Sequence, residues 1–456
     1  MTATNKQTLE QYLTPGTRVH LIGIGGVSMR PLGLVLRHMG LKITGSDMNA
    51  SVMTDDLIES GIPVFIGHRA ENIRGAQCII RTAAVHNDNP EVAAARAAGI
   101  PVFERAQAWG IIMRAYRNAI CLSGTHGKTT TTSMVTHIFM QAQRDPTVMI
   151  GGYLPLLHAG HRVGKGDTII MESCEYCNSF LNFFPTIAVI LNIEADHLDF
   201  FKDLRDVQAS FRRFAQLVPA GGHIVANGDD ANTRRALHGL DCLTFGLMQD
   251  NDIHGENYTT DWRDFDVIAN GKFYCHVHLN VMGQHNTYNA LAAAACGYLL
   301  GIDGADVAAG LESFRGAGRR MERKGEYHGA VIYDDYAHHP GELHALIQAL
   351  QTMEHRRIIL AFQPHTYTRT KALFSEFVRE LRQVNHVVLA EIYAARERNT
   401  IGISSRDLAK EIPGAVAFDT LPEVAAYLRE IAQPGDIIVT VGAGDIYKAG
   451  EMLLQD

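Results

Sequence analysis

The chain has 456 residues, of which 46% are hydrophobic and 20% are charged, and its formal net charge at pH 7 is −8. This length predicts about three domains, and the hydrophobic and charged fractions are those of ordinary globular proteins. The acidic balance argues against binding to nucleic acid, and the sequence shows neither a signal peptide nor an apolar stretch that predicts membrane insertion, so we expect a cytoplasmic protein.

The seven cysteines are scattered and odd in number, which favours free thiols over a disulfide framework. Cys174 and Cys177 have the spacing CxxC. A structural zinc site needs two more ligands at similar spacing, and a thioredoxin-like redox site needs its own βαβ context. We therefore interpret this pair as a chance spacing.

A β/α alternation begins at residue 18 and continues to about residue 116, which predicts a parallel sheet with crossover helices. Its first strand enters the glycine turn GIGGVS at residues 23–28. This turn is similar to the dinucleotide-binding fingerprint, with Ser28 in place of the third glycine and the acidic residue Asp47 about 20 positions later. The segment supports a diphosphate-containing ligand, either NAD or a nucleotide sugar.

A second unit begins near Arg117, and residues 119–132 (AICLSGTHGKTTTT) predict a strand, a glycine turn and a helix. Such a turn aims backbone N–H groups and the positive end of the helix dipole at one point, so it predicts a phosphate-binding loop. Lys128 adds a positive charge, and the Thr129 hydroxyl can bind a Mg²⁺ ion. The common pattern GxxxxGK[ST] needs a glycine where this chain has Leu122, so the loop is a shortened form that opens at Gly124.

Further strands, a hairpin with an Asn270-Gly271 turn and a long helix complete this unit, at residues 167–173, 186–193, 221–230, 265–281 and 283–301. Glu172 closes the first of these strands and can share a metal ion with Thr129. His197 follows the second strand and can hold a second metal ion or a phosphate oxygen. A capped strand end and a hydrogen-bonded loop histidine remain the alternative interpretations of these two residues.

A third alternation of strands and helices starts near Phe314, and its first segment, FRGAGRRME, is a candidate hinge. Two polar segments follow strands in this unit, DDYAHHP at 334–340 and FQPHTYTRT at 362–370. Because the carboxyl ends of parallel strands meet at one edge of a sheet, we expect the two segments to form one binding site.

The sequence resembles the Mur ligases, and the segments that carry the resemblance are GIGGVSM, GTHGKTTTT, NIEADHLD, GQHNTYN, GRRME, DDYAHHP, FQPHTYTRT and VGAGDI. The resemblance implies a three-domain α/β architecture: a Rossmann-like UDP-sugar domain at 1–116, a central P-loop-type ATPase domain at 117–314 and a Rossmann-like amino-acid domain at 315–456. It also implies ATP- and Mg²⁺-dependent ligation of L-alanine to the lactyl carboxylate of UDP-N-acetylmuramate through an acyl phosphate. We expect a monomer or a homodimer.

The resemblance assigns roles to individual residues. The phosphates of ATP are implied to contact Gly124, Thr125, His126, Gly127, Lys128, Thr129 and Thr130. The rest of the nucleotide is implied to contact Asn286, Asn289, Arg319 and Asp335. Mg²⁺ is implied to lie near Thr129, Glu172 and His197. The UDP-sugar is implied to contact Gly25, Gly26, Ser28 and, through a ribose hydroxyl, Asp47. The amino acid and the reacting carboxylate are implied to meet at Tyr336, His338, His365 and Arg369. Catalytic roles are implied for Lys128, Glu172, His197, Arg319, His338 and His365.

The chain also departs from the family pattern. The family commonly has EADExD where this chain has ESCEYC, so Cys174 and Cys177 replace carboxylates. Thr366 stands where an arginine is common. Two other functions remain open: a ligase that attaches a tripeptide to the same sugar, and an NAD-linked nucleotide-binding protein built on residues 23–28.

Overall fold

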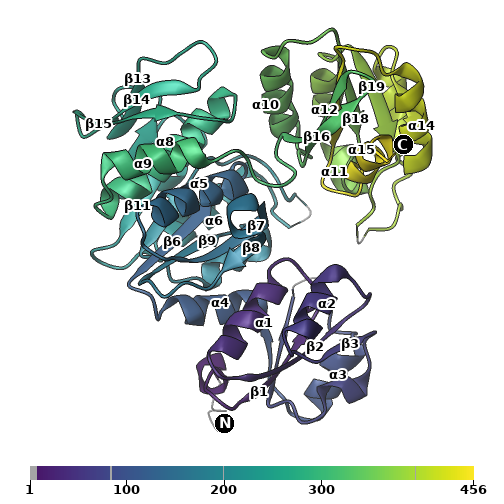
Figure 1. Ribbon diagram of the computed structural model, residues 1–456. Helices are drawn as coiled ribbons and strands as arrows, with labels where there is room; N and C mark the ends of the chain where they lie inside the picture. Colours follow the sequence, from purple (N-terminus) through teal and green to yellow (C-terminus); the bar gives the residue numbers. More distant parts are fainter. Residues whose placement is uncertain (1–7, 83–84, 199, 396, 456) are drawn as a thin grey trace.

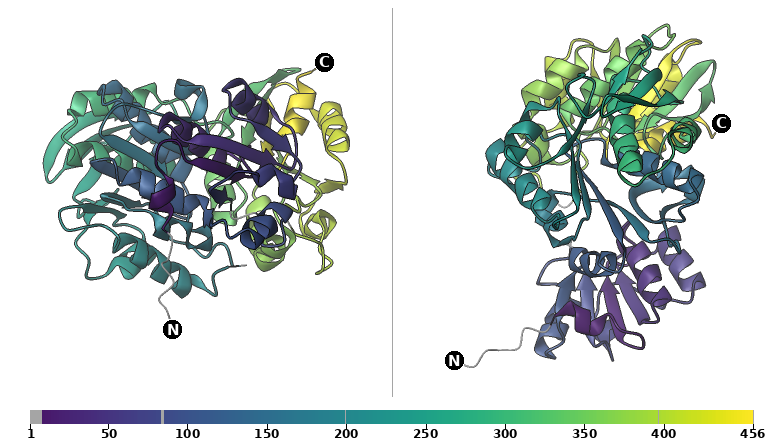
Figure 2. Two further views of the ribbon diagram at one scale, coloured as in Figure 1. Left: turned by 90° about the horizontal axis from the view of Figure 1, so that it is seen from below. Right: turned by 90° about the vertical axis from the view of Figure 1, so that its left-hand side faces the viewer.

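The computed structural model describes residues 8–82, 85–198, 200–395 and 397–455. Three α/β units follow one another along the chain and occupy three corners of the molecule (Figure 1). The N-terminal unit (purple) lies at the bottom of that view, the central unit (blue to green) above it, and the C-terminal unit (green to yellow) at the upper right. Figure 2 shows the same arrangement from below and from the side. The predicted three-domain α/β architecture is confirmed.

The N-terminal unit contains η1 (Leu9–Tyr12), β1 (Arg18–Ile22), α1 (Met29–His38), β2 (Lys42–Asp47), α2 (Val52–Glu59), β3 (Val64–Ile66), η2 (Ala70–Ile73), β4 (Cys78–Arg81), α3 (Pro90–Ala97), β5 (Val102–Glu104) and α4 (Arg105–Met113). Its strands form a parallel sheet in the order β3-β2-β1-β4-β5. The chain moves from β1 to one side and then returns to the other, so the loop after β1 lies at a topological switch point, where open α/β sheets bind ligands.

The central unit contains β6 (Asn118–Ser123), α5 (Lys128–Gln141), β7 (Thr147–Leu154), η3 (Pro155–Leu157), β8 (Ala159–Arg162), β9 (Thr168–Glu172), η4 (Tyr176–Asn182), β10 (Ile187–Ile190), α6 (Leu204–Ala215), β11 (His223–Asn227), α7 (Ala231–Leu237), β12 (Leu243–Gly246), β13 (Ile253–Glu256), β14 (Asp264–Ala269), β15 (Lys272–His278), α8 (Gln284–Leu299) and α9 (Gly304–Ser313). The sheet order is β15-β14-β13-β12-β11-β10-β6-β9-β7-β8, with the phosphate-loop strand β6 between two parallel neighbours.

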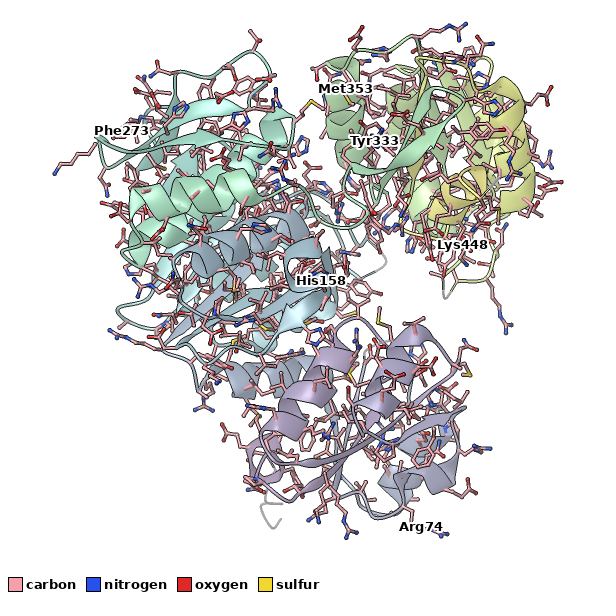
Figure 3. All side chains as sticks on the ribbon, viewed as in Figure 1. Arg74, His158, Phe273, Tyr333, Met353 and Lys448 are labelled. Carbon is pink, nitrogen blue, oxygen red and sulfur yellow. The ribbon has the colours of Figure 1, made fainter. Side chains whose placement is uncertain are left out.

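The expected hairpin is present as β14 and β15. Asn270 and Gly271 both have left-handed backbone angles, with φ of 48° and 71°. A two-residue type I′ turn requires positive φ at both positions, and Asn-Gly is the pair that adopts them most readily. Phe273, labelled in Figure 3, lies near the tip of this hairpin and is exposed.

The C-terminal unit contains β16 (Glu322–Tyr327), β17 (Ala330–Asp335), α10 (Pro340–Gln351), β18 (Ile358–Phe362), α11 (Tyr367–Ala372), α12 (Phe374–Leu381), β19 (His386–Ala390), α13 (Ser405–Glu411), β20 (Val416–Phe418), α14 (Leu421–Ile431), β21 (Ile437–Val441) and α15 (Tyr447–Leu453). The sheet order is β16-β17-β21-β18-β19-β20, and β17 and β18 both run parallel to β21. The segments that follow β17 and β18 therefore leave the sheet at the same edge, as the sequence predicts.

The three units differ in how they are joined. One continuous hydrophobic cluster runs from the N-terminal unit into the central unit, and Trp109 and Met113 of α4 are buried in it together with Phe180. The C-terminal sheet has its own hydrophobic layers on its two faces. Apolar packing thus fixes the N-terminal unit to the central unit. In the part of the chain that the structure describes, no helix is long and apolar enough to cross a membrane.

Candidate active site

The phosphate loop joins β6 to α5 through residues 124–127. Gly127 caps the helix with a left-handed φ of 81°. A Cβ atom at this position would lie 2.5 Å from Oδ1 of Asn289, a residue of α8. Glycine is needed here both for the backbone angle and for the close approach of α8. The first turn of α5 consequently presents its N–H groups toward the loop.

Asn192, which follows β10, holds the loop from the side. Its Oδ1 accepts a hydrogen bond from the backbone N–H of His126 at 2.8 Å, and its Nδ2 donates to the carbonyl of His126 at 3.1 Å. The Thr125 hydroxyl accepts from the backbone N–H of Glu194 at 2.9 Å. Hydrogen bonds from the segment after β10 therefore hold the shape of the loop.

Lys128 points back across the loop. Its Nζ donates to the carbonyls of Gly124 and Thr125, and it lies 3.1 Å from Oε2 of Glu175, a buried carboxylate. Burial disfavours the ammonium charge, but the carboxylates of Glu175 and Glu172 outweigh it and raise the pKa of Lys128. The lysine is thus a permanent cation at physiological pH.

Thr129 and Glu172 meet as the sequence predicts, because β9 lies next to β6. The Thr129 hydroxyl donates to Oε1 of Glu172 at 3.1 Å, and the other carboxylate oxygen accepts from the backbone N–H of Gly151 at 2.6 Å. Two hard oxygen donors beside a phosphate loop are the ligand chemistry that Mg²⁺ prefers. These residues fit a magnesium ion.

His197 lies on the other side of Glu175. Its Nε2 is 3.7 Å from Oε1 of Glu175 and 3.8 Å from Oδ2 of Asp196. Burial lowers the pKa of His197, which favours the neutral imidazole. A neutral imidazole can bind a metal ion or a phosphate through its lone pair. Glu175 therefore connects the two predicted residues Lys128 and His197.

A cavity of about 460 Å³ opens beside the loop, between the central and C-terminal units. Its volume suits a nucleotide. Tyr333, labelled in Figure 3, belongs to its wall on the side of the C-terminal unit that faces the central unit. Burial raises the pKa of Asp335, another wall residue, to about 6. The sequence-predicted residues that line the cavity are His126, Gly127, Thr130, Asn286, Asn289 and Asp335.

The two adjacent arginines of the candidate hinge, Arg319 and Arg320, make different contacts. Arg319 donates to Oδ2 of Asp334 at 2.8 Å and to the carbonyls of Gly442 and Gly444, so its guanidinium is engaged within the C-terminal unit. Arg320 instead lines the nucleotide-sized cavity. The structure therefore places Arg320 at the cavity, where the resemblance implied Arg319.

A second cavity, of about 320 Å³, lies between the same two units. His197 and Asp196 line it from the central unit, and His365 and Arg369 line it from the C-terminal unit. Nη2 of Arg369 lies 3.1 Å from Oδ1 of Asp196, and Nη1 lies 3.3 Å from Nδ1 of His365. Thr366, which replaces the arginine common in the family, also lines this cavity.

Tyr336 and His338 line neither cavity, but Tyr336 contacts Arg320 of the first cavity and His338 lies next to His365 of the second. Arg319 and Arg320 both lie over the Tyr336 ring, at 5.0 and 5.1 Å from its centroid. The rings of His338 and His365 are 5.8 Å apart. Burial lowers the pKa of His338 to about 4, so its imidazole is neutral near pH 7. The two polar segments of the C-terminal sheet thus come together.

The N-terminal loop carries the other predicted residues, Gly25, Gly26 and Ser28. The backbone N–H of Gly25 donates to Oδ2 of Asp47 at 2.9 Å. A Cβ atom on Gly25 would come within 3.0 Å of the same carboxylate. Asp47 therefore holds the loop shape in this structure, and Ser28 precedes the first turn of α1.

The CxxC pair occupies η4 and its approach, beside Glu175. Cys174 is partly buried, and burial raises the pKa of its thiol to about 12. Cys177 is exposed and has a left-handed φ of 54°. A thiol with so high a pKa is a poor nucleophile and a poor metal ligand at neutral pH.

Sequence reasoning missed several charged residues of this region, among them Glu175, Arg320 and Glu342. Glu175 lies within the ESCEYC segment, but the pattern does not show that it turns inward. Arg320 is adjacent to the arginine that the resemblance implied. Glu342 lies on α10 and pairs across the unit boundary with His126 at 3.3 Å. Its spacing from His339 matches a helix-capping box, which was the available signal.

Comparison with known proteins agrees with this geometry. Three family models match in order: Mur ligase family, catalytic domain, over residues 18–117; Mur ligase middle domain over 122–297; and Mur ligase, glutamate ligase domain, over 319–444. A UDP-N-acetylmuramate–L-alanine ligase of Caldanaerobacter subterraneus is 43% identical over 451 residues, covering 96% of this chain and 97% of the relative. One of Agathobacter rectalis is 45% identical, covering 96% and 97%.

Solved structures give the same result. The UDP-N-acetylmuramate-alanine ligase MurC of Thermotoga maritima superposes with a TM-score of 0.81 at 28% identity, covering 96% of this chain and 98% of that one. A murein peptide ligase of Psychrobacter arcticus shares the fold, with a TM-score of 0.73 at 22% identity and coverage of 96% and 98%. The phosphate loop, the cavities at the unit boundary and these full-length similarities lead to one conclusion: the chain belongs to the Mur ligase family.

Proposed function

We propose that the protein ligates L-alanine to the lactyl carboxylate of UDP-N-acetylmuramate, with ATP converted to ADP and phosphate, as a step of peptidoglycan precursor synthesis. The observation that carries this proposal is the 43–45% identity, over nearly the whole chain, to proteins named for that reaction. Because the reaction consumes ATP, we assign it to the cytoplasm.

The chemistry requires activation of the carboxylate. An amine cannot displace oxide from a carboxylate, so the γ-phosphoryl group of ATP is first transferred to the lactyl carboxylate. The amine of L-alanine then attacks the acyl phosphate and releases phosphate. Most of the rate in such transfers comes from positioning and from stabilisation of charge, which a fixed loop with a buried cation supplies.

We assign the UDP-sugar to residues 1–116, ATP to residues 117–314, and the amino acid to residues 315–456. The backbone of the phosphate loop binds the ATP phosphates, and Lys128 neutralises the transferred group. Asn286 and Asn289 contact the base side of the nucleotide, and Arg320 and Asp335 contact it from the C-terminal unit. Support comes from the cavity of about 460 Å³ that these last four residues line together.

Thr129 and Glu172 are the proposed ligands of Mg²⁺, and His197, which lies 3.7 Å from Glu175, is the proposed ligand of a second ion. The ion supplies positive charge next to the phosphates when it is bound. The proposal rests on the oxygen atoms of Thr129 and Glu172, which lie 3.1 Å apart.

The second cavity is the proposed meeting point of L-alanine and the activated carboxylate. Arg369 carries the charge that attracts an α-carboxylate, while His365, His338 and Tyr336 orient the reactants. Its volume of about 320 Å³ leaves room for a small amino acid and the reacting group. The N-terminal residues Gly25, Gly26 and Ser28 face the diphosphate of the sugar nucleotide.

The test is phosphate release from ATP in the presence of UDP-N-acetylmuramate, with and without L-alanine, together with the mass of the product. We expect release to require L-alanine. One methylene changes binding by about 1–3 kcal/mol, so glycine and L-serine should react poorly but measurably. Release that requires a tripeptide instead of L-alanine would assign the chain to the tripeptide ligases, and reduction of NAD without ATP turnover would refute ligation.

Arg369→Ala tests the amino-acid pocket. It removes the cation at the end of the second cavity, so the KM for L-alanine should rise by at least about tenfold while the KM for ATP changes little. Loss of ATP affinity with an unchanged KM for L-alanine would instead assign Arg369 to the phosphates.

A further inference from the structure

A cluster of imidazoles and carboxylates crosses the boundary between the central and C-terminal units. His126 of the phosphate loop and Glu194, which follows β10, come from the central unit. His339 and Glu342, at the start of α10, come from the C-terminal unit. Within this cluster, one donor atom each of His126, Glu194 and His339 lie within 4.8 Å of one another.

We propose that His126, Glu194 and His339 bind one zinc-like transition-metal ion, separate from the Mg²⁺ ligands Thr129 and Glu172. Two imidazoles and one carboxylate form a common donor set for Zn²⁺ in proteins, with water as the fourth ligand. His126 and Glu194 also line the nucleotide-sized cavity, so the site borders the proposed ATP site and its test uses the protein without nucleotide.

The donor spacing supports the site. Zinc bonds of about 2.0–2.2 Å at the tetrahedral angle separate neighbouring donor atoms by about 3.3–3.6 Å. Nε2 of His126 and Oε2 of Glu194 are 3.3 Å apart. Nδ1 of His339 is 3.8 Å from the same oxygen, so this pair is a few tenths of an ångström wider than a bound zinc ion requires.

The hydrogen bonds of the His339 imidazole are incomplete. His339 is 6% exposed, and its Nε2 is buried with no hydrogen-bond partner in the described part of the chain. Its Nδ1 only accepts a long hydrogen bond, of 3.3 Å, from the backbone N–H of Gly341. The proposed donor is Nδ1, and a metal ion there would replace the long bond from Gly341; the buried Nε2 lies outside the donor set.

Glu342 supplies the outer partner that metal-binding histidines usually have. Its Oε1 is 3.3 Å from Nδ1 of His126, on the side of the ring away from Glu194. A carboxylate at this position orients the ring and leaves the lone pair of Nε2 for the metal. The side chain of Glu194 is 43% exposed, which gives an ion a path from solvent.

Charge gives a further reason. Glu194 and Glu342 place two negative charges around His126. A protonated His126 compensates one of them, and a divalent ion bound to neutral His126 compensates both. A proton on Nε2 of His126 is therefore the alternative to a bound metal ion, and the two states differ in whether the protein binds Zn²⁺.

The test is calorimetric titration of Zn²⁺ alone into the full-length, nucleotide-free protein. We expect one ion per chain, with affinity reduced at least tenfold in His339→Asn and in Glu194→Gln. Asparagine is a good helix N-cap, so His339→Asn removes the ligand and keeps the start of α10. Bound Co²⁺ should show the visible absorption of tetrahedral coordination in the wild type and lose it in His339→Asn.

Matched controls define the site. His344→Asn removes an imidazole from the same helix that pairs with Glu380 at 2.9 Å, outside the cluster, and should bind Zn²⁺ as the wild type does. Glu172→Gln and the double substitution Cys174→Ser, Cys177→Ser should also retain the ion. Because the ligands come from two units, Zn²⁺ should raise the Tm of the wild type and not that of His339→Asn.

The proposal is overturned if the wild type binds no Zn²⁺, which would leave His126 as a protonated partner of two carboxylates. It is equally overturned if His339→Asn and Glu194→Gln bind as tightly as the wild type. Loss of the ion in Glu172→Gln or in the double cysteine variant would move it to the Mg²⁺ ligands or to the thiols.

Discussion

Two glycine loops of this molecule share one backbone design and use it differently. The loop after β1 and the loop after β6 each leave the carboxyl end of a parallel strand and enter a helix, α1 or α5. In the N-terminal loop the backbone N–H of Gly25 is bonded to the Asp47 carboxylate. In the central loop Lys128 lies across the turn, and Thr129 meets Glu172 beside it.

The difference shows how side chains decide what a glycine loop does. Backbone N–H groups alone can bind a diphosphate that does not react. A phosphoryl group in transfer needs additional charge stabilisation, which a lysine and metal ligands supply. Substitutions in the central loop should therefore lower the rate, whereas those in the N-terminal loop should weaken binding of the sugar nucleotide.

Lys128→Ala should have the largest effect, a loss of about 10³-fold or more in kcat, because the transferred phosphoryl group loses its buried cation. Steady-state ligation measures it. Arg30→Ala is the control beside the other loop, since Arg30 lies in the first turn of α1, directly after that loop, and pairs with Asp56 at 2.7 Å. Near-normal turnover by a folded Lys128→Ala protein would remove the distinction between the loops.

Glu172→Gln keeps the shape of the side chain and removes its charge. The Mg²⁺ concentration needed for half-maximal activity should rise about tenfold, because the amide is a weaker ligand for a hard cation. A Mg²⁺ titration at fixed ATP measures this change. If the titration curve does not move, Glu172 has only a structural role at the end of its strand, and it does not bind Mg²⁺ together with Thr129.

The sequence predicted the parts of the fold that local patterns determine. The phosphate loop, the Asn270-Gly271 hairpin and the alanine-rich helix α8 all have strong local signals, namely glycine spacing, turn chemistry and helical composition. Strands β7, β8, β12, β13, β16 and β20 were missed. The six residues of β16, ERKGEY, have no apolar alternation, and they form a strand because β17 pairs with them.

The residues of the candidate site were predictable where a single motif determines their position. They were less predictable where tertiary packing determines which side chain reaches the site. Thr129 and Glu172 meet because two predicted strands are neighbours. The choice between Arg319 and Arg320 depends on which guanidinium the carbonyls after β21 and Asp334 capture. Glu175 is buried next to Lys128 and is followed by left-handed residues at Cys177 and Asn178, and the composition of that segment indicates neither feature.

Asp47→Ala should have a moderate effect that is confined to the N-terminal loop. Loss of the acceptor for Gly25 costs about 1 kcal/mol in loop order, so the KM for UDP-N-acetylmuramate should rise about fivefold. The KM for ATP, measured in the same assay, should stay unchanged. Asp47→Asn retains an acceptor oxygen and should lie closer to the wild type; an equal rise in both constants would show that the loops are not independent.

The double substitution Cys174→Ser, Cys177→Ser should have the smallest effect, with kcat and the KM values within about twofold of the wild type. The partly buried thiol of Cys174 has a pKa of about 12 and is protonated at neutral pH, so a hydroxyl of similar size can replace it. Kinetics and metal analysis of the purified variant measure this. A large loss of kcat would mean that the cysteines hold Glu175 in position against Lys128.

The contact between Lys128 and Glu175 makes ligand entry an exchange of anions. The carboxylate is tethered to the site, so its effective concentration at the ammonium group is in the millimolar range or higher. A singly charged anion such as chloride competes poorly with this carboxylate for the ammonium group of Lys128. A triphosphate, which brings several charges and its own contacts to the loop, can displace it. Glu175 therefore competes with incoming anions for Lys128, and this competition favours the binding of polyanionic ligands.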